Sequence, residues 1–361
     1  MKKYLLLLMI CIALSSLNGC SLVPTVNVNE LNLIEATGFD LPKPNQLKGT
    51  VVFPVFRPSG QVEFNVSSAE GETIKKVRER LDSQMRYRLI SGQLRVVTFS
   101  MDLAKRGFFS IIDTFNRDPA VGNVIQLAIV DGETSDLLSL KQYQKENIAL
   151  YLYDLLLHNS DTGPFPYTDF ATFVYQYFEE GQDPYLPVLK VVNDKLKITG
   201  IALFKHDKLV TIIPWKYAFI FKAMKEDYKQ GLHQFKIDGE YVAIDNLVSK
   251  SKYDVKIKKG KPEFTIHLNM NARIQEYTGK KPIFFPKHIK QIKKAIENDI
   301  EKNAKELISL LQKNNVDPIG LGSKLEAHQR DFDVKKWNKQ YSSAKIKVKI
   351  NLDILHTGIV E

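Results

Sequence analysis

Two stretches in the last third of the chain alternate strictly between apolar and polar residues. The alternation, in residues 264–274 and 345–354, has a period of two, which places the apolar side chains on one face of a β-strand. Between them, residues 286–314 carry isoleucine and leucine at three- and four-residue spacing, the pattern of an amphipathic helix. Because both strands have one polar face, the sheet is expected to be antiparallel, with the long helix covering its dry face. The pattern predicts a C-terminal α+β domain over residues 251–361.

The rest of the sequence alternates between strand and helix patterns. At 361 residues the chain is longer than one ordinary domain, so several domains are expected. We predict a mixed α/β domain over residues 49–184 and a small central α/β domain over residues 185–250, which makes an α+β chain of three mixed α/β domains. The expected strands are 50–57, 61–66, 93–99, 123–131, 197–204 and 209–213, and the expected helices are 73–91, 102–116, 135–158 and 215–230.

The start of the chain has the organisation of an export signal. Lys2 and Lys3 form a charged start, residues 4–14 are apolar, and small residues precede Cys20. This apolar run of 11 residues is shorter than the ~20 residues that a membrane-spanning helix needs. We therefore predict a signal peptide over residues 1–19.

The segment LNGC at residues 17–20 resembles a bacterial lipobox, in which the cysteine is diacylated and becomes the mature N-terminus. The only other cysteine, Cys11, lies inside the expected signal peptide, so the mature chain would have no internal disulfide. Two acyl chains anchor a protein stably, whereas one chain binds a membrane only marginally. We expect Cys20 to carry a diacylglyceryl anchor with palmitate-type chains, followed by a tether over residues 20–48. The alternative is an ordinary signal peptide with an incidental cysteine.

The positive charge of the chain is concentrated in its C-terminal third. Residues 250–361 carry 24 Lys and Arg against 13 Asp and Glu, an excess of +11, so residues 1–249 carry −1 and the whole chain +10. A basic domain can bind nucleic acid or an anionic membrane. These lysines alternate with acidic and apolar residues, which favours a solvated face over a dedicated binding patch. We expect no nucleic-acid partner, and a contribution of the basic charge at a membrane face stays open.

Patterns of catalytic or metal-binding residues are hard to find. The seven histidines are scattered, and none lies at helical metal-ligand spacing from another. Gly320 and Gly322 lack the rest of a dinucleotide fingerprint, and residues 279–281 lack the rest of a P-loop, so both segments are interpreted as turns. The Gly-x-Ser-x-Gly elbow of a serine hydrolase does not occur in the sequence. The sequence predicts no catalytic residue, metal site or cofactor, and favours a protein that is not an enzyme.

Aromatic residues are concentrated between Phe165 and Tyr185, where eight of them occur. One interpretation is a helix over residues 167–180 whose aromatic side chains fill the core between modules. The other is an exposed docking face, because Tyr and Phe are common anchors in protein interfaces. The core interpretation is favoured.

Three internal segments, together with the cysteine at position 20, resemble one known family. Residues 101–123 contain LAKRG and RDP, and residues 198–210 read ITGIALFKHDKLV. Residues 317–325 read DPIGLGSKL and are followed by Trp337 and a closing strand that leads to Gly358. By this resemblance the chain is identified as a member of the Ger(x)C family, the lipoprotein C-subunits of spore germinant receptors in endospore-forming bacteria.

The resemblance implies a non-enzymatic receptor subunit of three mixed α/β domains on the outer face of the spore inner membrane. Such a subunit would assemble with A-type and B-type membrane subunits to trigger germination in response to small-molecule nutrients. It assigns lipid attachment to Cys20 and names no partner-binding residues. The main alternative is a lipid-anchored extracytoplasmic solute-binding protein, and an extracytoplasmic enzyme is a third possibility.

Overall fold

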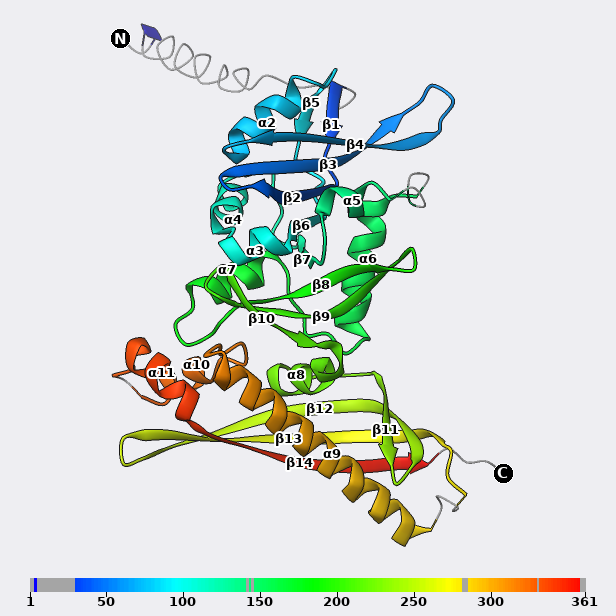
Figure 1. Ribbon diagram of the computed structural model, residues 1–361, viewed down its shortest axis with the longest axis vertical. Coiled ribbons are helices and arrows are strands. Elements are labelled where there is room, and N and C mark those ends of the chain that lie inside the picture. Colours follow the sequence, from blue (N-terminus) through cyan, green and yellow to red (C-terminus); the bar gives the residue numbers. More distant parts are fainter. Residues whose placement is uncertain are drawn as a thin grey trace.

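Two β-sheets of different construction lie along the long axis of the molecule, with one short helix between them (Figure 1). The computed structural model describes residues 3–4, 30–140, 143, 146–280, 285–329 and 331–357, without the side chains of residues 356 and 357. A mixed α/β architecture with a C-terminal sheet and a covering helix was predicted from the sequence, and the structure confirms it.

The first sheet has eight strands in the order β10-β9-β8-β7-β6-β2-β3-β4. Four central strands are parallel, and an antiparallel hairpin extends the sheet at each edge. Every residue of β6 and β7 is buried, as expected for parallel strands with helices on both faces. The strands are β2 (Ala36–Lys43), β3 (Gln46–Phe56), β4 (Val62–Gly71), β6 (Val96–Ser100), β7 (Gln126–Val130), β8 (Tyr185–Val192), β9 (Lys195–Lys205) and β10 (Lys208–Pro214).

Helices cover both faces of this sheet. One face packs against α2 (Ile74–Asp82), α3 (Met101–Arg106), α4 (Phe109–Asn116) and α7 (Phe170–Phe178). The other face packs against α5 (Thr134–Leu138) and α6 (Ile148–Asp161). A separate parallel pair, β1 (Leu31–Leu33) with β5 (Arg88–Ile90), lies at the end of the molecule where the described chain begins (Figure 1).

The second sheet has four strands in the order β11-β12-β13-β14. The predicted alternation is confirmed, since the apolar residues of β13 and β14 face the core beneath the long helix α9. The expectation of a wholly antiparallel sheet is wrong for one pair, because β14 runs parallel to β13. The connection between these strands contains α9, and a helical crossover returns the chain in the same direction. The bounds are β11 (Leu232–Ile237), β12 (Glu240–Lys258), β13 (Lys261–Tyr277), α9 (Pro286–Lys313) and β14 (Lys345–Thr357).

Helix α8 (Ala218–Lys225), preceded by the 3-10 turn η4 (Trp215–Tyr217), lies between the two sheets (Figure 1). Its residues Phe221 and Met224 are fully buried in one continuous core with Ile201 of β9 and Ile266 of β13. A helix that packs between two apolar layers is expected to be buried on nearly all sides. The remaining elements are α10 (Leu321–Glu326), α11 (Val334–Gln340) and the 3-10 turn η5 (Tyr341–Ser343).

The sheets do not follow the domain boundaries predicted from the sequence. The expected central domain over residues 185–250 has no sheet of its own among the described residues, because β8 to β10 belong to the first sheet and β11 and β12 belong to the second. Short antiparallel hairpins join the edge of a neighbouring sheet readily, because an edge strand offers unpaired backbone groups. The boundary at residue 250 falls inside β12.

The expected tether over residues 20–48 is also too long. Residues 31–48 contribute β1, β2 and the start of β3. Asp40 in β2 is fully buried, and its carboxylate accepts backbone hydrogen bonds from Thr134 (2.7 Å) and Ser135 (3.1 Å) at the start of α5. Pro44, which suggested an interrupted segment, lies in the turn between β2 and β3.

Four of the predicted helices are shorter or divided, and the one expected over 215–230 is formed by η4 and α8 and ends at Lys225. The helix expected over 102–116 is split at Gly107, whose φ of 104° is incompatible with a helix interior. The helix expected over 73–91 ends at Asp82 because the chain then enters β5. The helix expected over 135–158 is divided into α5 and α6, with residues 141, 142, 144 and 145 between them outside the described part.

Candidate functional site

The turn after α9 is organised around the buried carboxylate of Asp317. Asp317 is 3% exposed, and its side chain accepts hydrogen bonds from the backbone N–H groups of Gly320 (3.0 Å), Leu321 (3.0 Å) and Gly322 (2.8 Å). The indole Nε1 of Trp337 donates a fourth bond at 3.3 Å. The glycine-rich turn therefore already holds an anion of its own chain, which supports its interpretation as structural and not phosphate-binding.

This turn is fastened directly to the first sheet. The backbone N–H of Asp183, just before β8, donates to the carbonyl of Asp317 at 3.0 Å. The Oδ2 atom of Asp183 accepts from the N–H of Asp317 at 2.7 Å and from Nζ of Lys205 at 3.0 Å. Burial raises the pKa of Asp317 to about 6, and the neighbouring Asp183 adds to this increase.

Two glycines permit the close approach at this joint. A Cβ atom on Gly322 would lie 2.4 Å from Nε1 of Trp337 and 2.5 Å from Cα of Gly181. Gly320 has a φ of 80°, a left-handed conformation that side chains with a Cβ disfavour. We name the contact of residues 180–183 with 317–323 the Asp317 joint.

A second contact links the two other segments that resembled the family motifs. The Oδ2 atom of Asp207, in the turn between β9 and β10, accepts a hydrogen bond from the backbone N–H of Phe109 at 2.8 Å. A Cβ atom on Gly107 would lie 2.7 Å from the same carboxylate oxygen. The glycine therefore makes room for an acidic side chain that caps the start of α4.

Two lysines of α8 lie between the sheets, Lys222 buried and Lys225 half-buried, and no sequence pattern pointed to them. Nζ of Lys222 donates to the carbonyl oxygens of Ser160 (2.5 Å) and Gly163 (3.0 Å), and the ammonium lies 4.3 Å from the ring centre of Tyr228. Burial lowers the pKa of Lys222, and burial also lowers the pKa of Lys225 to about 8. A lysine inside an apolar helix pattern is normally exposed, so only the packed structure identifies this pair.

The aromatic segment is divided between core and surface. Phe170 and Phe173 are buried, as the core interpretation expected. Tyr177 stacks on Phe109 with ring centres 3.6 Å apart. Tyr175 is 57% exposed and Phe178 is 66% exposed. One side of α7 therefore fills the core, and its other side presents two aromatic residues to solvent.

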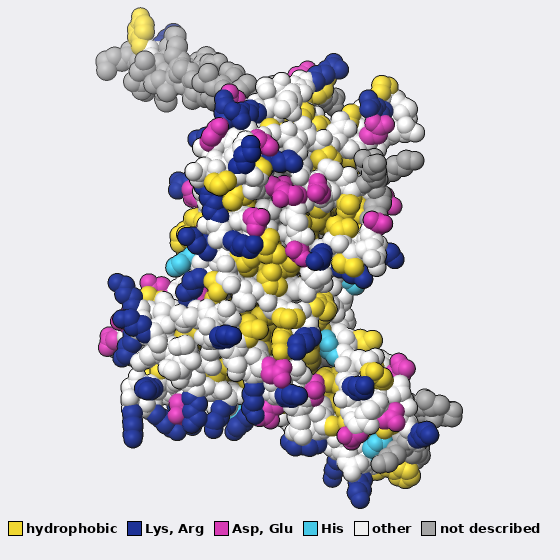
Figure 2. Space-filling view, in the orientation of Figure 1, with side chains coloured by type: hydrophobic (Ala, Val, Ile, Leu, Met, Phe, Trp, Pro, Cys, Tyr) yellow, Lys and Arg dark blue, Asp and Glu magenta, His cyan; other side chains and the backbone are white. Residues whose placement is uncertain are grey.

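The basic excess of the C-terminal third gathers on the wet face of the second sheet. The register places Lys252, His267 and Lys349 side by side across three strands, and Asp254 beside Thr265 and Lys347 in the next row. Figure 2 shows Lys and Arg side chains in a row along the outer edge of this sheet. This face lies at the end of the molecule opposite β1 (Figure 1).

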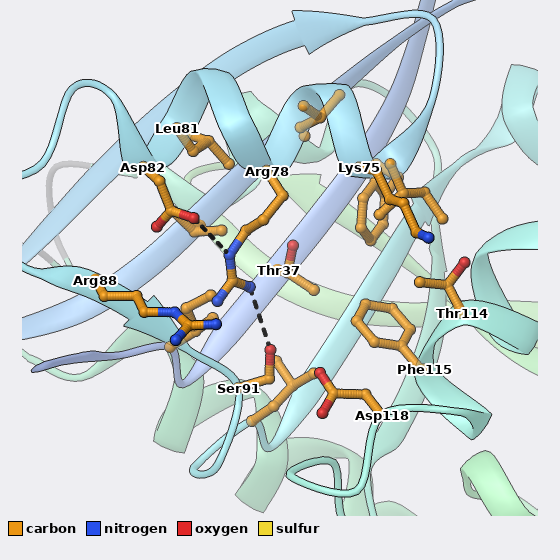
Figure 3. Close-up of a pocket in the computed structure, with 17 residues that line it drawn as sticks. Thr37, Lys75, Arg78, Leu81, Asp82, Arg88, Ser91, Thr114, Phe115 and Asp118 are labelled. Atoms are coloured by element: carbon orange, nitrogen blue, oxygen red, sulfur yellow. Dashed lines mark hydrogen bonds and ion pairs between the residues drawn. The ribbon is translucent and has the colours of Figure 1, made fainter. Parts of the chain in front are cut away.

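A pocket of about 320 Å³ opens between α2, α4 and the first sheet (Figure 3). Its wall is mainly apolar and includes Phe39, Val51, Leu81 and Phe115. The charged residues at this pocket are Lys75, Arg78, Asp82, Arg88 and Asp118. We call it the α2 pocket.

One residue with a predicted role lies in a part of the chain that the structure does not describe. Cys20, the predicted lipid-attachment residue, lies outside the described residues. Within the described ranges, no group of three or more His, Cys, Asp or Glu side chains is arranged to hold a metal ion. In the same ranges, no helix has the length and apolar character needed to cross a bilayer.

Comparison with known proteins covers both halves of the chain. Residues 24–191 match the family model described as the spore germination protein N-terminal domain, and residues 199–358 match the C-terminal model described as spore germination B3/GerAC like. The chain is 33% identical over 364 residues to the spore germination protein GerQC of Bacillus cereus, with 100% of both chains covered. It is 23% identical to the putative spore germination protein YfkR of Bacillus subtilis, over 99% of this chain and 97% of that protein.

The fold also matches a solved structure. A crystal structure of the GerBC protein superposes with a TM-score of 0.60 at 16% identity, covering 90% of this chain and 98% of that one. At 16% identity this match supports the assignment of the fold.

Proposed function

This chain belongs to the Ger(x)C family of spore germination proteins, and we propose that it is the lipid-anchored C-subunit of a spore germinant receptor. The observation that carries the proposal is the full-length match, at 33% identity, to a spore germination protein. The fold supports it, because two sheets joined through one buried core make an extended body with a large surface for partners. The subunit works by assembling with A-type and B-type membrane subunits and not by turning over a substrate.

The proposed anchor is a diacylglyceryl group on Cys20, which holds the chain on the outer face of the spore inner membrane. Eleven residue steps separate Cys20 from Leu31, the start of β1. At ~3.5 Å per residue, a fully extended segment of this length reaches about 40 Å. The end of the molecule that carries β1 is therefore the end held near the membrane.

The exposed aromatic residues of α7 support a partner surface on this body. Tyr175 and Phe178 bury large apolar areas when a partner covers them, and such residues are common interface anchors. A lipid-anchored solute-binding protein is the alternative, and such proteins usually have two similar doubly wound lobes with a hinge. The two sheets here differ in strand number and strand order, which favours the receptor subunit.

Spores that lack this protein test the function directly. We expect such spores to lose the response to at least one nutrient, and we expect the intact gene to restore it. Normal germination with every nutrient, combined with loss of uptake of one solute, would instead favour the solute-binding alternative.

A further inference from the structure

The α2 pocket exists because two helices on the same face of the first sheet stand apart. Gly49 of β3 lies directly beneath α2, and a Cβ atom there would lie 2.6 Å from Cγ1 of Val77. This close approach holds α2 against the sheet on one side of the pocket, while Phe115 of α4 forms the opposite wall (Figure 3). The space between is lined by apolar side chains from β2, β3, α2 and α4 and is partly open to solvent.

The polar groups of the pocket are not equally available to a ligand. The guanidinium of Arg78 is held by Asp82 at 3.4 Å, by the carbonyl of Leu89 and by Oγ of Ser91 at 3.4 Å. Asp82 also accepts from the backbone N–H of Leu89 at 3.0 Å. Arg78 and Asp82 therefore neutralise each other and hold the rim in shape.

The groups that remain are mainly cationic. Among the described residues, none forms a hydrogen bond or ion pair with the side chains of Lys75 or Arg88, both of which are exposed at the rim. Asp118 is the one opposing carboxylate, and its Oδ1 accepts from the backbone N–H of Ala120 at 3.0 Å. Three cations and two carboxylates leave the pocket with one positive charge in excess.

We propose that the α2 pocket binds a small carboxylate with an apolar body, whose head group pairs with Arg88 and whose body lies on Phe39, Val51 and Phe115. An apolar wall with a few polar groups at the rim is the usual construction of a small-molecule site. The hydroxyl of Ser91, fixed by Arg78, lies beside the head-group position and can donate to the carboxylate. The inference rests on the geometry of the pocket and does not depend on the proposed receptor function.

The volume limits the size of the ligand. At roughly 30 Å³ per atom of water size, about 320 Å³ holds on the order of ten non-hydrogen atoms. Octanoate is a probe of this size. The comparison probes 1-octanol and octylammonium keep an apolar chain of similar length and replace the carboxylate by a neutral hydroxyl or a cationic ammonium group.

Calorimetric titration of the unlipidated mature chain with these three probes tests the proposal. We expect octanoate to bind with one-to-one stoichiometry and roughly tenfold more tightly than 1-octanol, because a charge-assisted hydrogen bond to a guanidinium adds about that factor. We expect Arg88→Gln to remove the advantage of octanoate and to leave 1-octanol unchanged. Arg86→Gln is the matched control, since Arg86 is an exposed arginine two residues away that stacks on Tyr87 and does not line the pocket.

A second variant tests the position of the apolar body. Thr114 lines the pocket from the half-buried surface of α4, and Thr114→Phe places a ring in the space. We expect this change to weaken octanoate and 1-octanol alike, while the unfolding midpoint shows that the chain still folds. The proposal is overturned if octanoate shows no saturable binding, if octylammonium binds as tightly as octanoate, or if either variant leaves octanoate binding unchanged.

Discussion

Asp183 and Asp317 lie 134 positions apart, and each donates its backbone N–H to an oxygen of the other, at 3.0 Å and 2.7 Å. The first of these residues precedes β8 of the large sheet, and the second follows α9 of the small sheet. Because both residues are buried, water does not compete for these bonds in the folded chain. The Asp317 joint therefore couples the two halves of the molecule rigidly.

The first prediction concerns the closest contact in this joint. Gly322→Val places side-chain atoms where Trp337 and Gly181 already lie within 2.5 Å of the new Cβ. We expect the variant to lose roughly 3 kcal/mol or more of unfolding free energy, because backbone atoms must move to relieve the overlap. The measurement is the denaturant midpoint of the mature chain.

Gly122→Ala is the control for this change. Gly122 has a backbone conformation open to other residues, and nothing lies within 4 Å of an added Cβ. We expect its midpoint to stay within about 0.5 kcal/mol of the wild-type stability. Equal midpoints for Gly322→Val and Gly122→Ala would show that the joint accommodates the added side chain without a loss of unfolding free energy.

The second prediction is a loss of stability in mild acid through His233. The ring of His233 lies 3.6 Å from the ring centre of Phe219, and burial, assisted by Lys222, lowers its pKa to about 3. Asp245 opposes this decrease. The unfolded chain takes up the proton near pH 6.5, whereas the folded chain does not. The contribution of His233 to stability is therefore fully present above pH 6.5 and is lost as the pH decreases toward 3.

We expect His233 to cost the protein about 1 kcal/mol of stability at pH 5.5 relative to pH 7.5. His233→Gln removes the titrating group and should flatten this part of the pH profile. The exposed His328→Gln is the matched control and should leave the slope unchanged. The same slope in all three proteins would assign the acid sensitivity to other groups.

The third prediction concerns the wet face of the second sheet. Lysines near an anionic bilayer contribute ~1 kcal/mol each, and salt weakens this attraction. We expect the unlipidated mature chain to bind anionic vesicles weakly at low salt and to dissociate at high salt. Replacing Lys252, Lys347 and Lys349 by Gln should reduce this binding.

The matched control replaces three exposed lysines of α11, Lys335, Lys336 and Lys339, which lie in the same half of the chain but not on this sheet face. Because the wet face lies at the end opposite β1, the lipid and this face reach one membrane only if the molecule lies along it (Figure 1). If the sheet variant and the α11 variant lose vesicle binding equally, the attraction is a property of total charge.

The fourth prediction is that the mature N-terminus is a diacylated Cys20. Mass spectrometry of the membrane-bound protein should give a chain that begins at residue 20 with the added lipid mass. Cys20→Ala should yield a folded chain that is no longer retained in the membrane fraction, because the first buried core residue in the described part of the chain is Ile34. An unmodified Cys20 in the mature protein would rule out this anchor.

Much of the fold could be predicted from local patterns. The alternation of residues 264–274 and the helical spacing after Pro286 specify which faces are buried, and burial of those faces drives the packing. The direction of β14 could not be read in the same way, because a half-buried strand has the same alternation in parallel and antiparallel pairs. The short hairpins of β8 to β10 gave no sign of which sheet they join.

The candidate sites were less predictable. The turn at Asp317 was recognisable by its glycines, but its partner Asp183 was not, since the bond between them spans 134 positions. The buried Lys222 looked like an ordinary surface lysine on a helix. The α2 pocket depends on the spacing of two helices, which no sequence period specifies.

The most direct test of the receptor-subunit account is affinity purification of the tagged, lipidated protein from spore membranes, with quantitative identification of the proteins that accompany it. The account predicts that A-type and B-type receptor subunits are recovered in amounts comparable to the tagged chain. It also predicts that the Cys20→Ala variant recovers less of both, because it no longer lies on the same membrane. Recovery of the lipidated chain without either subunit, from membranes that contain both, would contradict it.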